Sequence, residues 1–233
     1  MQRDHYGEHH RKISDGWIRA SIFGMSDGLV TNVSFILGFA GASPAHNVVR
    51  LAGLASLVAG SFSMGSGEYL SMRAQKELFE YEINVERRAL LEFPDAEQQE
   101  LRELFESRGI HGDLAERLSA DLMRDPDLAL RTHAREELGI DPSATGSPLG
   151  AALGSSASFA VGALVPLVPW IVSAHGNDIL ASIILAGVGS ASLGGAIGWF
   201  TKRGTVRWAV RQIVITAIAA AVTFTVGRLV GVR

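Results

Sequence analysis

Five long apolar segments constrain the fold of this chain more than any other feature of its sequence. They lie near residues 20–42, 48–72, 149–172, 177–200 and 207–230. Each is long enough for a transmembrane helix, which needs roughly 20 apolar residues. A helix satisfies its backbone hydrogen bonds internally, as lipid requires, and no strand pattern competes with it. The sequence therefore predicts an all-α, polytopic membrane protein with five transmembrane helices.

The acidic residues are concentrated between the second and third apolar segments. Of the 24 acidic residues, 18 lie within residues 73–146, and only Asp178 lies beyond them. The net charge of −3 therefore averages an acidic soluble part and an apolar membrane part. We divide the chain into a polar, His-containing N-terminal tail (1–19), two transmembrane helices (20–72), an acidic helical insert (73–146) and three more transmembrane helices (147–233).

One long helix is expected to join the membrane to the insert. Residues 48–93 contain no Pro, and no Gly in their second half, so a helix that leaves the bilayer near Met72 can continue in water until Pro94. Gly109 and Gly139 are expected to end helices within the insert. Three shorter amphipathic helices should therefore follow, at residues 96–108, 113–123 and 127–138.

The basic residues predict the orientation in the membrane. Five spans place the two termini on opposite sides. One side of this topology holds the insert together with Arg3, Arg11, Lys12, Arg19, Lys202, Arg203, Arg207 and Arg211, and the other holds Arg50, Arg228 and Arg233. By the positive-inside rule, the N-terminus and the insert are cytoplasmic and the C-terminus lies on the opposite side.

Composition excludes several other classes of protein. The chain has no cysteine, which excludes disulfides and thiolate metal sites. We expect no cleavable signal peptide, because residues 1–19 contain no apolar core. The same tail contains His5, His9 and His10, which either collect a divalent cation or have no role. No nucleophile motif or phosphate-binding loop is present, so we expect a protein that is not an enzyme.

Asp27 is the acidic residue that lies well inside an apolar segment, seven residues from its inner end. Met64 lies about as far from the inner end of the second segment, which runs in the opposite direction. At roughly 1.5 Å per residue both are about 10 Å from the cytoplasmic side, so they can meet. Carboxylates are costly inside a membrane and mark functional sites. The alternative is that Asp27 caps a helix or pairs with Arg19, while Met64 only fills space.

The second apolar segment contains two adjacent stripes of side chains. One consists of small residues at spacings of three and four, Gly53, Ser56, Gly60, Ser63 and Gly67. Small residues permit close helix packing in lipid, so this face should contact a neighbouring helix. The other stripe offers a hydroxyl, two thioethers and a carboxylate as metal ligands, from Ser61, Met64, Glu68 and Met72. Glu68 is thus a further candidate for a metal path, nearer the membrane surface.

The insert contains three pairs of candidate metal ligands, each pair one helical turn apart. They are Glu82 with Glu86, Glu97 with Glu100, and His133 with Glu137. Paired carboxylates on facing helices suit Fe²⁺, Mn²⁺ or Zn²⁺, and an imidazole adds a ligand of borderline softness. The alternative is that these glutamates only solvate helices beside basic residues.

Three runs of sequence resemble the vacuolar iron transporter family. They are GMSDGLVTN at 24–32, SFSMGSGEYLS at 61–71 and REELGID at 135–141. The resemblance covers the chain after its N-terminal tail, including the five spans and the insert. It implies transport of ferrous iron and similar divalent ions in exchange for protons, and a homodimer with the path near the two-fold axis.

The resemblance also implies roles for individual residues. Asp27 and Met64 would line the transport path. The insert would bind metal through Glu86, Glu97, Glu100 and Glu137. The chain departs from the family pattern at three positions, where Ser56 and Ala89 replace glutamates and His133 replaces a methionine.

We therefore expect a proton-coupled exporter of Fe²⁺, or of Mn²⁺, from the cytosol, with a glutamate-rich insert that collects the ion. Its partners would be divalent cations, protons, the lipid bilayer and a second copy of the chain, with no prosthetic group and no nucleic acid. One alternative is a membrane-anchored di-iron oxidase, but that chemistry needs two Glu-x-x-His motifs, and the insert's histidines are only His111 and His133. A metal sensor or scaffold without transport is another alternative, although it would have no use for Asp27.

Overall fold

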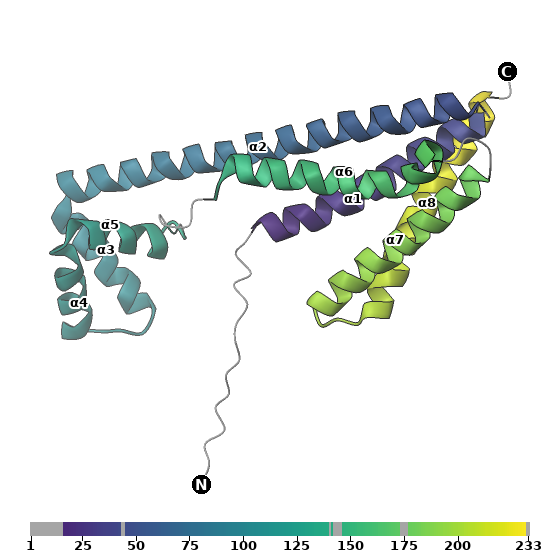
Figure 1. Cartoon of the computed structure of the whole chain (residues 1–233). Helices are drawn as coiled ribbons and strands as arrows, with labels where there is room; N and C mark the ends of the chain where they lie inside the picture. The colour runs from purple at the N-terminus through teal and green to yellow at the C-terminus, as the bar shows by residue number, and fades with distance from the viewer. Residues whose placement is uncertain (1–15, 43–44, 140, 142–145, 173–176, 232–233) are drawn as a thin grey trace, which may run out of the picture. The chain divides into compact units, whose positions relative to one another are not determined.

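The computed structural model describes residues 16–42, 45–139, 141, 146–172 and 177–231 of the 233-residue chain. Within these residues the regular structure consists of helices, without strands, which confirms the all-α prediction (Figure 1). The helices are α1 (Gly16–Ala42), α2 (His46–Glu92), α3 (Pro94–Ser107), α4 (Asp113–Met123), α5 (Pro126–Glu136), α6 (Pro148–Val172), α7 (Asp178–Phe200) and α8 (Thr205–Gly231). Five of them, α1, α2, α6, α7 and α8, are long and apolar enough to cross a membrane, as predicted.

The chain forms two compact units. Residues 1–69 and 148–233 make up the first, called here the membrane unit, and residues 70–147 make up the second, the insert. The α2 helix is unbroken from His46 to Glu92 and contributes residues to both units, as the sequence predicts. The α1 helix begins at Gly16, before the expected end of the N-terminal tail. The candidate histidines His5, His9 and His10 lie outside the described residues.

In the membrane unit, α1 packs directly against α6 (Figure 1). A Cβ at Gly28 would overlap the carbonyl oxygen of Phe159, and a Cβ at Gly162 would overlap that of Met25. The two backbones can approach so closely because glycine has no side chain. The pairs Gly28 with Phe159 and Asn32 with Ala163 show that the two helices run parallel. Small residues of both helices therefore set their register.

The α7 and α8 helices form an antiparallel hairpin. The α8 helix also packs against α1. The Ser190 and Thr216 hydroxyls form a buried hydrogen bond of 2.8 Å between the two helices. A Cβ at Gly194 would lie 2.5 Å from the Trp208 carbonyl oxygen, so this pair too approaches closely. A buried hydrogen bond and a glycine contact thus fix the hairpin.

The α6 helix continues through two prolines. Proline inside a helix commonly kinks or ends it, but α6 remains helical past Pro166 and Pro169 to Val172. Both prolines are buried, so neighbouring helices surround this turn. Ser182 of α7 donates a hydrogen bond to the Pro166 carbonyl at 2.7 Å and accepts one from Trp170 at 2.9 Å. Prolines are tolerated in membrane helices where neighbouring helices surround them.

The membrane half of α2 contacts α6 and α1 through its small-residue stripe. A Cβ at Gly53 would lie 3.2 Å from the Ile36 side chain and would also meet Leu167, and Gly60 faces the Phe159 ring. Ile36 and Leu167 belong to a buried apolar cluster with Val49 and Trp170. The expected role of these glycines in packing is therefore confirmed for Gly53 and Gly60.

The insert has its own apolar core, formed by Leu101 and Phe105 of α3 and Ala115 of α4. The α5 helix begins at Pro126 and is capped by Asp125, whose carboxylate accepts hydrogen bonds from two backbone amides of the first turn. Gly109 and Gly139 follow α3 and α5 with φ of +89° and +65°. Both are the expected stops, because glycine adopts positive φ without a steric cost.

Candidate functional site

A pocket of about 350 Å³ in the membrane unit brings together the predicted membrane candidates. Its walls come from α1, α2 and α6. The lining residues are Phe23, Asp27, Thr31, Gly60, Ser63, Met64, Gly67, Glu68 and Phe159. Asp27, Met64 and Glu68 thus line one pocket, although Asp27 is far from the other two in sequence.

Asp27 lies on the α1 wall and accepts a hydrogen bond of 3.3 Å from the Thr31 hydroxyl, one turn later. The opposite wall differs in two respects from the expected ligand stripe: Ser63 rather than Ser61 lines the pocket with Met64 and Glu68, and Met72 is not among the lining residues. Ser63 and Gly67 were expected only to pack against a helix. The small-residue stripe therefore packs against α6 at Gly53 and Gly60 and opens toward the pocket further along α2.

The pocket offers a set of donor atoms suited to a divalent cation. Two carboxylates supply hard, negatively charged oxygens, and the Met64 thioether supplies a softer donor. Hydroxyls of Thr31 and Ser63 add polar contacts. Because a carboxylate is costly in a membrane unless it has a partner, Asp27 and Glu68 are suited to hold a cation here.

The insert contains a second cluster, made of Glu86, Glu97, His133 and Glu137. One ligand atom from each residue lies within 4.8 Å of the others. The His133 Nδ1 atom is 2.7 Å from Glu137, 3.2 Å from Glu86 and 3.6 Å from Glu97. His133 itself is fully buried, and Glu86 is nearly so. Helices α2, α3 and α5 thus contribute to one acidic cluster, with Glu137 at the end of α5.

Burial and mutual repulsion shift the protonation of this cluster. Burial raises the pKa of Glu86 from 4.5 to about 7, and the negative charge of Glu137 adds to this effect, while His133 opposes it. Burial also raises the pKa of Glu97. For His133, burial acts to lower the pKa, but the hydrogen bond and charge of Glu137, with the charges of Glu86 and Glu97, outweigh it and raise the pKa. Glu86 therefore keeps its proton to a higher pH than an exposed glutamate does.

The donor set of the cluster fits a divalent cation. The His133 Nε2 atom is buried and forms no hydrogen bond with the described atoms. Buried polar atoms without partners are costly and need an explanation such as a bound ion. Three carboxylates and one imidazole could together supply four ligands to Mn²⁺, Fe²⁺ or Zn²⁺.

Two further predicted ligands lie outside this cluster. Within the described part of the chain, the group of close ligand atoms includes neither Glu82 nor Glu100. Glu100 is exposed on α3, but its charge still raises the pKa of Glu86 and of Glu97, so it is electrostatically coupled to the cluster. Glu82 lies one turn before Glu86 on α2. The i, i+4 spacing identified Glu86 and Glu137 but could not show which partner of each pair points inward.

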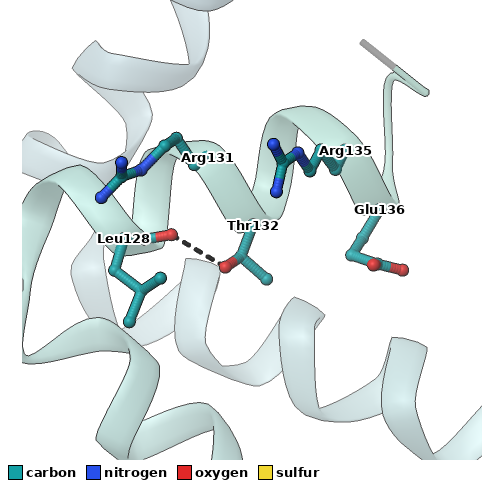
Figure 2. A pocket seen from close by; sticks show the side chains of 5 residues that line it. All are labelled: Leu128, Arg131, Thr132, Arg135 and Glu136. Carbon is teal, nitrogen blue, oxygen red and sulfur yellow. Dashed lines mark hydrogen bonds between the residues drawn. The ribbon is translucent and has the colours of Figure 1, made fainter. Parts of the chain in front are cut away.

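The face of α5 opposite His133 and Glu137 is lined mainly by basic and uncharged side chains (Figure 2). A hollow of about 440 Å³ there is lined by Leu128, Arg131, Thr132, Arg135 and Glu136. Two of its charged side chains are already paired, because Arg135 contacts Asp141 at 3.0 Å and Glu136 contacts Arg108, and Arg131 donates a hydrogen bond to the Asp127 backbone carbonyl. The Thr132 hydroxyl donates to the Leu128 carbonyl, as the dashed line shows. The hollow therefore presents no convergent set of free ligands, unlike the acidic cluster.

The sequence profile of the VIT family matches residues 18–228 of the chain. The chain belongs to the VIT family. The match includes α2 through α7 in full and both groups of candidate ligands. Together with the five long apolar helices, membership of the VIT family shows that the chain is an integral membrane protein.

Several members of the VIT family are similar over nearly the whole chain. The vacuolar iron transporter of Acanthamoeba castellanii is 32% identical over 96% of this chain and 83% of its own length. Vacuolar iron transporter 1 of Oryza sativa subsp. japonica is 30% identical over 98% of this chain and 92% of its own length. Vacuolar iron transporter 1 of Arabidopsis thaliana is 28% identical over 97% of this chain and 91% of its own length.

One ionic contact of this VIT family member was not predicted from its sequence. Asp178, in the first turn of α7, is buried and lies 3.3 Å from the Nε2 atom of His46 at the start of α2. The Trp170 ring of α6 packs against His46 with ring centres 5.2 Å apart. The position of Asp178 after 36 residues without another acidic residue was the only signal available, because its partner is remote in sequence.

Proposed function

We propose that this VIT family protein transports Fe²⁺, with Mn²⁺ as an alternative cargo, out of the cytosol in exchange for protons. The observation that supports the proposal most directly is the convergence of Asp27, Met64 and Glu68 on one pocket between membrane-spanning helices. The relatives are named vacuolar iron transporters, which agrees with a metal cargo.

The chemistry of the pocket suggests how metal and proton could exchange. A carboxylate in a membrane is stable when it binds either a proton or a cation. In this scheme, the entering cation binds the Asp27 carboxylate and displaces a proton from it, while Thr31 orients the side chain through its hydrogen bond. Met64 adds a soft donor that suits Fe²⁺ better than Ca²⁺ or Mg²⁺.

Transport in proteoliposomes under an imposed pH gradient tests this function. Asp27→Asn keeps the size and hydrogen bonding of the side chain but removes its charge and its titration, so we expect it to abolish Fe²⁺ uptake and proton counterflow. Met64→Leu should slow uptake and alter ion preference more mildly. Asp121→Asn, at an exposed ion pair of α4, is a matched control that should transport normally. Near wild-type uptake by Asp27→Asn would rule out the pocket as proposed and make Glu68 the next candidate.

The acidic cluster of the insert is proposed to collect the metal ion before transport. Support comes from its four converging donors and from the buried His133 Nε2 atom, which forms no hydrogen bond with the described atoms. Calorimetric titration of Mn²⁺ into the full-length Asp27→Asn protein isolates this cluster from the membrane pocket. Glu86→Gln and Glu97→Gln should each lower the affinity at least about tenfold. The exposed Glu103→Gln is the control, and Glu100→Gln decides whether that residue is also a ligand.

These measurements also separate the alternative functions. Binding by the insert without transport by the reconstituted protein would favour a metal sensor. Oxidation of Fe²⁺ by oxygen in the purified protein would favour an oxidase.

We further propose that the protein works as a homodimer with a cytoplasmic insert. Large apolar side chains of α2 and α8, among them Phe62 and Leu229, are exposed in the single chain, as expected for contact with lipid or with a second copy. Five helices are few to enclose an ion path, so a second copy would complete it. Light scattering of the purified protein with its detergent contribution subtracted should give the mass of two chains.

A further inference from the structure

The membrane pocket is closed on one side by the Phe159 ring. This α6 side chain lines the pocket yet is only 2% exposed. Its ring packs against Gly60 of α2, where any Cβ would overlap the ring atoms. Its backbone is equally confined, because a Cβ at Gly28 of α1 would overlap the Phe159 carbonyl oxygen. Since the backbone is held between helices, the ring can move chiefly by rotating its side chain.

A second polar level follows directly beyond the ring. Asn32 lies one turn after Gly28 on α1, and Ala163 lies one turn after Phe159 on α6. The Asn32 Nδ2 donates a hydrogen bond of 2.6 Å to the Ala163 carbonyl. Ser56 occupies the same level of α2, one turn from Gly60 on the same helical face, and is buried. Asn32 is fully buried, and its Oδ1 atom forms no hydrogen bond with the described atoms. A buried amide oxygen without a partner is costly and needs a ligand or a functional explanation.

An apolar layer lies beyond Asn32 and Ser56. It consists of Ile36, Val49, Leu167 and Trp170, which form one buried cluster. Ile36 and Leu167 fill the space next to Gly53, which lies about one turn before Ser56 on α2. The Asn32 oxygen is therefore enclosed between two apolar barriers, the Phe159 ring on the pocket side and this cluster on the other.

We propose that Phe159 is the gate between the pocket and an occluded cation position at which the Asn32 side-chain oxygen is a ligand. This proposal rests on the proposed transport function and adds the step that follows binding at Asp27. In the closed state, the ring separates Asn32 from the pocket. Rotation of the ring admits the cation to the Asn32 oxygen, a donor type that hard divalent cations accept.

The absence of cysteine from the sequence permits a direct test of the gate. Ser63→Cys introduces a single thiol in the pocket, and Ser56→Cys introduces one beyond the ring. A membrane-impermeant thiol reagent is supplied on both sides of proteoliposomes, so the orientation of the protein does not matter. We expect Ser56→Cys to react about tenfold more slowly than Ser63→Cys, which corresponds to an opening free energy of about 1.4 kcal/mol.

Removal of the ring should abolish this difference. Phe159→Ala in the Ser56→Cys protein is expected to raise its labelling rate to that of Ser63→Cys. Phe159→Leu is a second variant, which keeps apolar volume but lacks the outer ring atoms that cover Gly60, and it should also raise the rate. Thermal unfolding shows which variants are folded. Equal labelling of the two cysteines with Phe159 present, or slow labelling of Ser56→Cys in a folded Phe159 variant, would overturn the gate.

The role of Asn32 is tested by uptake of Mn²⁺. Asn32→Leu keeps a similar size without the oxygen and should lower uptake at least about tenfold, whereas Asn32→Asp keeps an oxygen ligand and should retain uptake. Normal uptake by Asn32→Leu would remove Asn32 from the path. Labelling does not require transport, so the two proposals fail separately. Uptake by Asp27→Asn would refute the proposed function and leave the labelling pattern unchanged, while a failed labelling pattern would refute the gate alone.

Discussion

His46 and Asp178 show how one ionic contact can stabilise the membrane unit. Asp178 is buried, so its carboxylate depends on the His46 imidazole at 3.3 Å. The His46 side chain is itself 28% exposed, but its removal leaves the buried Asp178 carboxylate without this partner and should destabilise the fold. We expect His46→Ala to lower the unfolding temperature of the detergent-solubilised protein clearly. His111→Ala, on the exposed α3–α4 connection, is the matched control, and an equal unfolding temperature for both variants would contradict this role.

The acidic cluster should make the metal-free insert sensitive to pH. The folded-state pKa of Glu86, about 7, lies above its ordinary value of 4.5, and that of His133 is raised as well. A group with a raised folded-state pKa stabilises the fold below its unfolded pKa, and this contribution is lost as pH rises through the folded pKa. For Glu86 the loss between pH 5 and 8 amounts to up to about 3 kcal/mol.

Hydrogen exchange of the α3–α5 amides, measured with a chelator present, checks this dependence. Protection should fall as pH rises from 5 to 8, after correction for the intrinsic exchange rate. Glu86→Gln cannot ionise, so its protection should change less over the same range. Addition of Mn²⁺ at pH 8 should restore protection, because the cation replaces the lost protons. A metal-free wild type that gains protection with rising pH would have the opposite sign from that predicted.

Single residues differed in how far the sequence could predict them. Asp27 could be identified from sequence as a candidate site residue, because an acidic residue inside an apolar segment is rare and costly. Asp178 was visible in the sequence, but its partner lies on α2, and only the register of three helices shows their contact. Glu97 was predictable as a ligand candidate, whereas its neighbour Glu100 proved to be exposed, because one turn of spacing does not fix which side chain points inward.

At the scale of elements, glycine contacts determine how α1 and α6 pack. A Cβ at Gly162 would overlap the Met25 carbonyl oxygen, whereas a Cβ at Gly187 on α7 would meet no atom within 4 Å. We therefore expect Gly162→Ala to destabilise the protein by about 1–3 kcal/mol through overpacking. Gly187→Ala should be neutral or slightly stabilising, since alanine favours the helix.

Thermal unfolding of the two glycine variants, in the same detergent, compares them directly. The pair is informative because both replace a glycine with an alanine inside a membrane-spanning helix. If Gly162→Ala unfolded at the same temperature as Gly187→Ala, the close backbone approach of α1 and α6 would not be important for stability.

The helices themselves were largely predictable from sequence, because long apolar segments, Pro94 and the two stop glycines are strong local signals. Two features required the tertiary structure. The α6 helix passes through Pro166 and Pro169 because neighbouring helices surround them, which a local rule cannot include. The small-residue stripe of α2 has two roles, packing at Gly53 and Gly60 and lining a pocket at Ser63 and Gly67, and only the positions of α1 and α6 distinguish them.

At the scale of the whole molecule, the connection between α7 and α8 should lie at the cytoplasmic surface. Lys202 and Arg203 in this turn and Arg207 and Arg211 at the start of α8 are exposed. Trp199 is also exposed near this turn, and Arg211 lies 5.1 Å from the centre of the Trp208 ring. Tryptophan and basic residues are enriched where cytoplasmic helix ends meet lipid head groups. This concentration of charge therefore predicts which side of the membrane each connection occupies.

The orientation follows from counting spans from that turn. Since α8 crosses the membrane once more, a reporter fused after Arg233 should face away from the cytoplasm. From the same turn, α7 and α6 cross back in sequence, so a reporter inserted at Gly146, before α6, should face the cytoplasm. Alkaline phosphatase, active only outside the cytoplasm, and green fluorescent protein, fluorescent only inside it, give opposite signals at each site. If both sites reported the same side, an odd number of spans could not separate them, and the five-span topology would be wrong.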